Sequence, residues 1–148
     1  MSSKLRVAAG AALIASACAN VPTFADDHAF TEGPVVNVAM IRTVDGKTDD
    51  YLRWLDTTWK ASQEASKKAG YIEGYEVLMA NPQGPNDPDV LLVITYKNWA
   101  ALDGALAKGD EISKQIEGSV SAANQSEANR SKIRRVLGSQ TMQVAMLK

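Results

Sequence analysis

The spacing of hydrophobic and polar residues changes several times along the chain, and the changes predict a mixed α+β fold. Residues 34–43, 72–80 and 90–97 are rich in β-branched and apolar side chains, which is typical of strands. A fourth strand is predicted over residues 141–147. Between the second and third strands, residues 81–89 contain three prolines, which predict an exposed hairpin loop.

Two segments between the predicted strands carry apolar residues at helical spacing. The first helix is expected to begin with Thr48 as its N-cap and to stop at Gly70. The second is expected to begin after Asn98, to break near Gly109 and to continue to about Val136. The resulting order, β-α-β-β-α-β, is that of the ferredoxin-like fold, in which a four-stranded antiparallel sheet carries both helices on one face.

The predicted sheet is apolar on both faces. Its first strand offers Val36 and Val38 in one phase and Val35 and Ile41 in the other. Because the helices cover only one face, the second face needs a separate cover. The same sheet of a second copy would provide a self-complementary one. We therefore expect a homodimer packed sheet to sheet.

The N-terminal segment has the composition of a secretory signal. Two basic residues precede the apolar run 7–19, which is too short to span a bilayer as a helix. Cleavage is expected after Ala25, with cleavage after Ala19 or lipidation of Cys18 as alternatives. We therefore expect an exported protein, periplasmic or secreted, without a membrane span. Three parts are predicted: a signal peptide over 1–25, a flexible start over 26–33 and one domain over 34–148.

The charge and the rare residues exclude several functions. Without the two basic residues of the signal, the remaining chain has 14 Lys and Arg and 17 Asp and Glu, and these charges are well mixed along it. This excess of acidic residues disfavours nucleic acids and anionic membranes as partners. Cys18 and His28 are the only residues of their types. His28 follows two aspartates and could hold a divalent metal weakly, but a solvated terminal histidine explains it better, so we expect no metal and no cofactor.

Four polar residues form the candidate site: Asn37, Glu76, Thr95 and Gln143. Each interrupts a set of alternate strand residues that are otherwise apolar or small. They are expected to share the face opposite the helices and to line a pocket inside the dimer. The alternative is that they only satisfy hydrogen bonds at the subunit contact. Burial of Glu76 would favour its protonated form and suit it to proton exchange. Trp54, to one side of the first helix, is expected to flank the pocket entrance.

Other conspicuous side chains have structural interpretations. Trp59 shares the apolar stripe of the first helix and is predicted to be a core residue. Arg130, Lys132, Arg134 and Arg135 are predicted to lie in the last turns of the second helix. Cations there complement the helix dipole.

Three segments carry a resemblance to a known superfamily: 51–55 (Tyr-Leu-Arg-Trp-Leu), 96–102 (Tyr-Lys-Asn-Trp-Ala-Ala-Leu) and 135–139 (Arg-Val-Leu-Gly-Ser). Over residues 34–148 the chain resembles the dimeric α/β-barrel superfamily, which includes antibiotic-biosynthesis-type monooxygenases, the ethyl tert-butyl ether degradation proteins and the NIPSNAP group. The resemblance implies a ferredoxin-like sheet-to-sheet dimer. Haem-binding members use a histidine ligand, and no histidine follows position 28, so haem is not expected.

Two functional classes remain. The chain lacks a Gly-rich phosphate loop, a Ser-His-Asp set and an HExxH sequence, so the usual hydrolases and nucleotide enzymes are disfavoured. The favoured hypothesis is a non-enzymatic dimeric barrel that binds a small molecule or is purely structural. The alternative is a cofactor-independent monooxygenase or isomerase-like enzyme acting on a small, largely apolar substrate. An enclosed cavity would favour binding, and a filled interior would favour a structural role.

Overall fold

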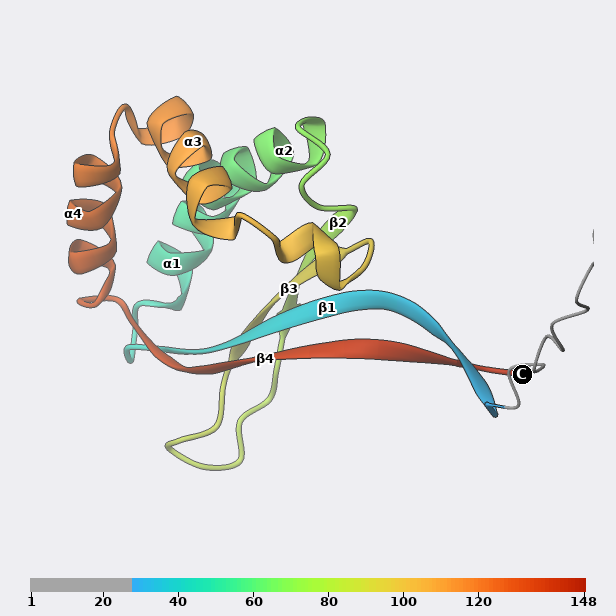
Figure 1. The fold of residues 1–148 in the computed structure, drawn as a ribbon. Coiled ribbons are helices and arrows are strands. Elements are labelled where there is room, and N and C mark those ends of the chain that lie inside the picture. Colours follow the sequence, from blue (N-terminus) through green and yellow to red (C-terminus); the bar gives the residue numbers. More distant parts are fainter. Residues whose placement is uncertain (1–27) are drawn as a thin grey trace, which may run out of the picture.

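The computed structural model describes residues 28–148, which form a four-stranded antiparallel sheet with every labelled helix on one side of it (Figure 1). The strands are β1 (Phe30–Thr43), β2 (Gly74–Met79), β3 (Val90–Tyr96) and β4 (Arg134–Leu147), in the order β2-β3-β1-β4. This order, with β1 and β3 in the centre, confirms the predicted ferredoxin-like α+β fold. The predicted signal peptide lies outside the described residues.

The first helical segment is continuous, as predicted. It consists of α1 (Thr48–Trp54), the π-helical turn η1 (Leu55–Trp59) and α2 (Lys60–Lys68), and the chain reverses at Gly70, whose φ is +75°. Thr48 is not the cap, because Lys47 occupies the N-cap position and the Thr48 hydroxyl lies 2.9 Å from the hydroxyl of Thr43. None of the helices between residues 28 and 148 has the length and apolar character needed to cross a membrane.

The second helical segment differs from the prediction. It is divided into η2 (Trp99–Leu102), a 3₁₀ turn that Asn98 caps as expected, α3 (Ala105–Glu117) and α4 (Val120–Arg130). The breaks fall at Gly104 and Gly118, whose φ values of +69° and +82° suit glycine. Gly109, the predicted break, lies inside α3 instead.

The last strand begins earlier than the sequence pattern indicates. The sequence pattern predicts helix to about Val136, but residues 134–136 pair with residues 41–43 of β1. As part of a strand, these residues pair their backbone groups with β1. The predicted basic cluster is therefore divided: Arg130 lies in the last turn of α4, whereas Arg134 lies on β4.

The core lies between the sheet and the first helical segment. Ile41 and Val90, which pair across β1 and β3, are almost completely buried with Tyr51 and Leu55 beneath them. In β1 the odd-numbered residues from Val35 to Thr43 therefore face the helices, and the even-numbered ones face away.

The opposite face of the sheet, called the open face below, is also largely apolar. Met142 and Leu78 on its two edge strands are 45% and 44% exposed. The strand register assigns these apolar residues to it: Val36, Val38, Met40, Leu78, Leu91, Val93 and Met142. The sheet is thus apolar on both sides, as the sequence predicts, and no helix of the described chain covers the second side (Figure 1).

Candidate functional site

Two of the four predicted site residues, Asn37 and Gln143, lie on the helix side of the sheet. Asn37 is two residues from the buried Val35, and Gln143 pairs directly with Val35. The Asn37 amide donates a hydrogen bond to the Thr141 hydroxyl at 2.9 Å. The Gln143 amide oxygen accepts one from the Trp99 indole at 3.1 Å. Both amides therefore bind groups of the chain itself.

The other two, Glu76 and Thr95, lie on the open face. Glu76 pairs with Val93, and Thr95 pairs with Val36, which places both away from the helices. The four residues therefore do not share one face, because β1 is apolar in both phases and its pattern does not reveal which phase faces the helices. Glu76 is exposed on the edge strand β2, so its burial would require a partner.

Trp54 packs inward among the helices. Its ring stacks on the Tyr51 ring at 5.8 Å between centroids and 13° between planes. The Arg130 guanidinium lies 4.1 Å from the centre of the Trp54 ring, in a cation–π contact from α4. Tyr51 is completely buried there, and burial raises its pKa to about 12 against the opposing effect of Arg134 and Arg130. This tryptophan thus joins α1 to α4, and it is absent from the walls of the two cavities described next.

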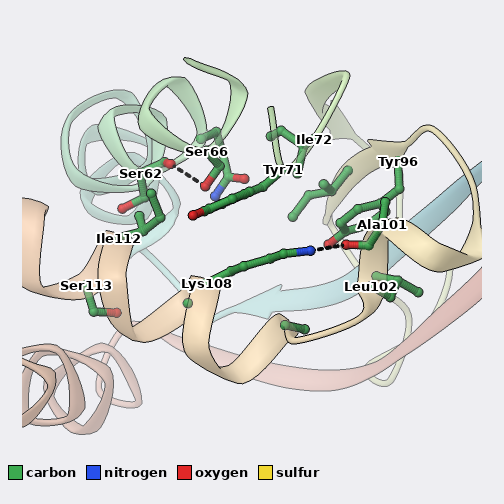
Figure 2. Close-up of a pocket in the computed structure, with 14 residues that line it drawn as sticks. Ser62, Ser66, Tyr71, Ile72, Tyr96, Ala101, Leu102, Lys108, Ile112 and Ser113 are labelled. Carbon is green, nitrogen blue, oxygen red and sulfur yellow. Dashed lines mark hydrogen bonds between the residues drawn. The ribbon is translucent and has the colours of Figure 1, made fainter. Parts of the chain in front are cut away.

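A cavity of about 250 Å³ lies between α2, α3 and the end of β3 (Figure 2). We call it the helix–sheet cavity. Its apolar wall combines both layers of the fold, since Ile94 belongs to the sheet and Ile112 to α3. Leu102 of η2 and Ile72, which follows α2, complete this wall. Residues from five segments meet here: α2, the connection that follows it, β3, η2 and α3.

Serine hydroxyls form part of the cavity wall. The Ser62 hydroxyl donates to the carbonyl of Thr58 at 3.0 Å, and the Ser66 hydroxyl donates to the carbonyl of Ser62 at 2.8 Å. Figure 2 shows both serines on α2 at one end of the cavity. Since their protons are used within the helix, these hydroxyls offer a ligand only acceptor lone pairs. Neither serine is prepared as a nucleophile.

Lys108 crosses the cavity from α3. Its Nζ donates to the carbonyl oxygen of Ala101 at 2.8 Å and lies 5.4 Å from the centre of the Tyr71 ring. Figure 2 shows the lysine extended beside Tyr71, with its amine directed at Ala101. The ring and the carbonyl together hold the cation at the wall of the cavity.

The two tyrosines of the cavity remain protonated near neutral pH. The Tyr71 hydroxyl donates to the Glu111 carboxylate at 2.7 Å, and this bond, with a smaller effect of burial, raises the pKa of Tyr71. Burial raises the pKa of Tyr96. Neither hydroxyl therefore supplies a phenolate base, and the Tyr96 hydroxyl keeps a proton that it could donate to a ligand.

Gly109 also lines this cavity. It lies inside α3 with ordinary helical backbone, and a Cβ added there would meet no atom within 4 Å. A glycine inside a helix costs about 0.5–1 kcal/mol relative to alanine. The missing side chain leaves open space beside α3 at the exposed margin of the cavity, at a cost in helix stability.

A second cavity of about 220 Å³ lies beside the π-helical turn η1. Its walls include Leu52, Trp59 and Val77, and Trp59 meets Tyr75 edge to face at 5.3 Å and 88°. Trp59 is only partly buried, so it is a cavity wall at the margin of the core. This cavity has fewer polar groups than the first and offers a ligand less directional binding.

Sequence reasoning missed the helix–sheet cavity because its polar residues lie on helices, where polar residues usually face solvent. One signal was present: Ser62 interrupts the apolar stripe that includes Leu52, Leu55 and Trp59. Within residues 28–148 no three His, Cys, Asp or Glu side chains are grouped so that they could hold a metal ion.

Fold and cavity together define a ferredoxin-like α+β protein with a small amphipathic cavity between its helices and its sheet. No family model matches the sequence, and no curated protein matches it. Among solved structures, the chain is similar to the crystal structure of HapK from Hahella chejuensis, with a TM-score of 0.50 and 15% sequence identity. The match covers 73% of this chain and 90% of HapK. At this identity the likeness concerns the fold alone.

Proposed function

We propose that the protein is a non-enzymatic binding protein for a small, largely apolar molecule, which occupies the helix–sheet cavity. The observation that carries the proposal is the lining, in which apolar side chains surround a few polar groups of defined orientation. Ligand pockets commonly measure about 300 to 1,000 Å³. A cavity of about 250 Å³ therefore suits a small ligand.

The polar groups of the cavity favour binding over catalysis. The Ser62 and Ser66 protons are used by helix carbonyls, and Tyr71 and Tyr96 are held in their neutral forms. No carboxylate or histidine is among the described residues that line the cavity. The alternative, a cofactor-independent oxygenase or isomerase, would need a base to take a proton from the substrate.

The proposal also includes self-association and export. The uncovered apolar face supports a homodimer packed sheet to sheet, as in the dimeric α/β-barrel superfamily that the sequence resembles. In such a dimer Glu76 and Thr95 would lie at the contact. The composition of residues 1–25 supports export. Ligand binding in the helix–sheet cavity does not require the dimer, because its lining comes from one chain.

The binding proposal can be tested by filling the cavity from Gly109. Gly109 lies within α3 and lines the cavity, so Gly109→Phe adds a ring where there is open space. Ala107→Phe is the matched control, because Ala107 is an exposed residue of the same helix outside the lining. We expect the wild-type protein and the control to bind the neutral fluorescent probe N-phenyl-1-naphthylamine, and Gly109→Phe to lose this binding at least tenfold.

Native mass spectrometry of the three proteins, purified without denaturation, reports any retained ligand in parallel. A retained mass is expected with the wild type and Ala107→Phe, and not with Gly109→Phe. If Gly109→Phe bound the probe as tightly as the wild type, the cavity would not be the binding site. If the wild type bound neither probe nor ligand, the binding function itself would be wrong.

A further inference from the structure

Lys108 is the only charged residue among the described residues that line the helix–sheet cavity. Its ammonium group carries three donors, and one of them is used by the Ala101 carbonyl. No carboxylate within residues 28–148 lies within 4 Å of its Nζ. The carboxylate one turn further along α3, that of Glu111, accepts the Tyr71 hydroxyl instead. The lysine is partly buried, and its ammonium group has free donors and no ionic partner among the described residues.

A partly buried cation without a counter-charge is unfavourable unless something else compensates it. The Ala101 carbonyl and the Tyr71 ring are the contacts that the described chain provides to this cation. A surface lysine would extend into water, but this side chain lies along the cavity wall (Figure 2). This arrangement leaves ammonium donors in the cavity that an anion could accept.

The remaining polar groups define where that anion would sit. Ser62 and Ser66 present acceptor lone pairs and would repel a negative group at their end of the cavity. The Tyr96 hydroxyl, protonated and without a hydrogen bond inside the described part of the chain, is a second donor. The anion therefore belongs near Lys108, and the apolar wall formed by Ile72, Ile94 and Ile112 receives the rest of the molecule.

We infer that the ligand is a monocarboxylate with a compact apolar body, held by an ion pair with Lys108. This inference rests on the proposed binding function and specifies its ligand. One lysine neutralises one charge, so a phosphate dianion would retain an uncompensated charge in a partly buried site. A primary amine would place like charges together and is excluded by the same cation.

The test compares three probes of equal chain length, octanoate, 1-octanol and octylamine, by calorimetry and by displacement of N-phenyl-1-naphthylamine. With the wild type, octanoate should bind at least tenfold more tightly than 1-octanol, and octylamine should bind most weakly. In Lys108→Met, which keeps an apolar stem of similar length, octanoate should lose this advantage while 1-octanol is unaffected. Lys108→Arg should restore the preference for octanoate, and Lys132→Met, a change of an exposed lysine, should leave all three affinities unchanged.

The outcomes separate this inference from the function on which it rests. If octanoate and 1-octanol bind the wild type equally, or if Lys108→Met leaves octanoate affinity intact, the carboxylate assignment is wrong. Loss of both probes in Gly109→Phe would then still support the cavity as a binding site. If no probe binds the wild type, or if Gly109→Phe binds them all unchanged, both the inference and the proposed function are wrong.

Discussion

At the scale of single residues, helix stability and cavity volume make opposite demands at Gly109. A side chain would stabilise α3, whereas glycine leaves the space beside it open. Because its φ is not left-handed and an added Cβ meets nothing within 4 Å, alanine fits without strain. Gly109→Ala should therefore raise the free energy of unfolding by about 0.5–1 kcal/mol, mainly by restricting the unfolded chain. Urea denaturation followed by circular dichroism measures the change.

The same substitution at Gly118 is the control for this prediction. Gly118 ends α3 with φ at +82°, where a side chain is strained whatever the free space around it. Gly118→Ala should lower the free energy of unfolding by about 1 kcal/mol. A loss of stability in Gly109→Ala would mean that the glycine meets a backbone requirement and does not serve the cavity.

At the scale of elements, one carboxylate joins α4 to β4. Glu127 of α4 accepts hydrogen bonds from Arg134 of β4 at 2.8 and 3.0 Å and forms an ion pair with Arg130. The two guanidinium groups lie over the rings of Trp54 and Tyr51, which belong to α1. Partial burial alone would raise the pKa of Glu127, but the hydrogen bonds and charges of Arg130 and Arg134 outweigh it and hold the pKa below its usual value.

This junction predicts a pH-dependent part of the stability. Because the pKa of Glu127 is lower in the folded than in the unfolded chain, its contribution is present above the unfolded pKa and is lost as the pH falls through the folded one. Glu127→Gln should therefore lower the free energy of unfolding by about 1 kcal/mol at pH 7, a modest value because the carboxylate is 54% exposed. The difference from the wild type should disappear at acidic pH.

Thermal and urea unfolding between pH 2.5 and 7 measures this dependence. The control is Glu73→Gln, since Glu73 is exposed in the turn before β2 and should show no such difference. A constant difference between Glu127→Gln and the wild type at every pH would indicate a packing effect and would contradict the electrostatic explanation.

The elements were more predictable than their boundaries. The strands follow from their runs of β-branched residues, which depend on local sequence. The end of α4 does not, because residues 134–136 become a strand only through pairing with β1, a contact between segments about ninety residues apart. The sequence also does not show which face of the sheet Asn37 occupies, because both faces of β1 are apolar. The cavity depends on how α2, α3 and the end of β3 pack against one another, and local patterns carry no information on that.

At the scale of the whole molecule, the open face of the sheet is an apolar surface that no helix of the described chain covers. Its apolar residues continue from Leu78 on one edge strand to Met142 on the other, through both central strands. Contiguous apolar surface of this kind in a soluble protein usually marks an interface. A second sheet packed against it at about 10 Å would bury both faces at once.

We therefore predict that Leu78→Lys dissociates the proposed dimer. Lysine at this position would bring a charge into a sheet-to-sheet contact, where its desolvation is not compensated, and the dimer dissociation constant should rise at least tenfold. Leu106→Lys is the matched control, because Leu106 is 82% exposed on α3, away from the sheet. Sedimentation velocity between 1 and 50 µM should show dimers for the wild type and Leu106→Lys and monomers for Leu78→Lys. A wild type that sediments as a monomer throughout would mean that the apolar face has another cover, and equal behaviour of the two variants would place the interface elsewhere.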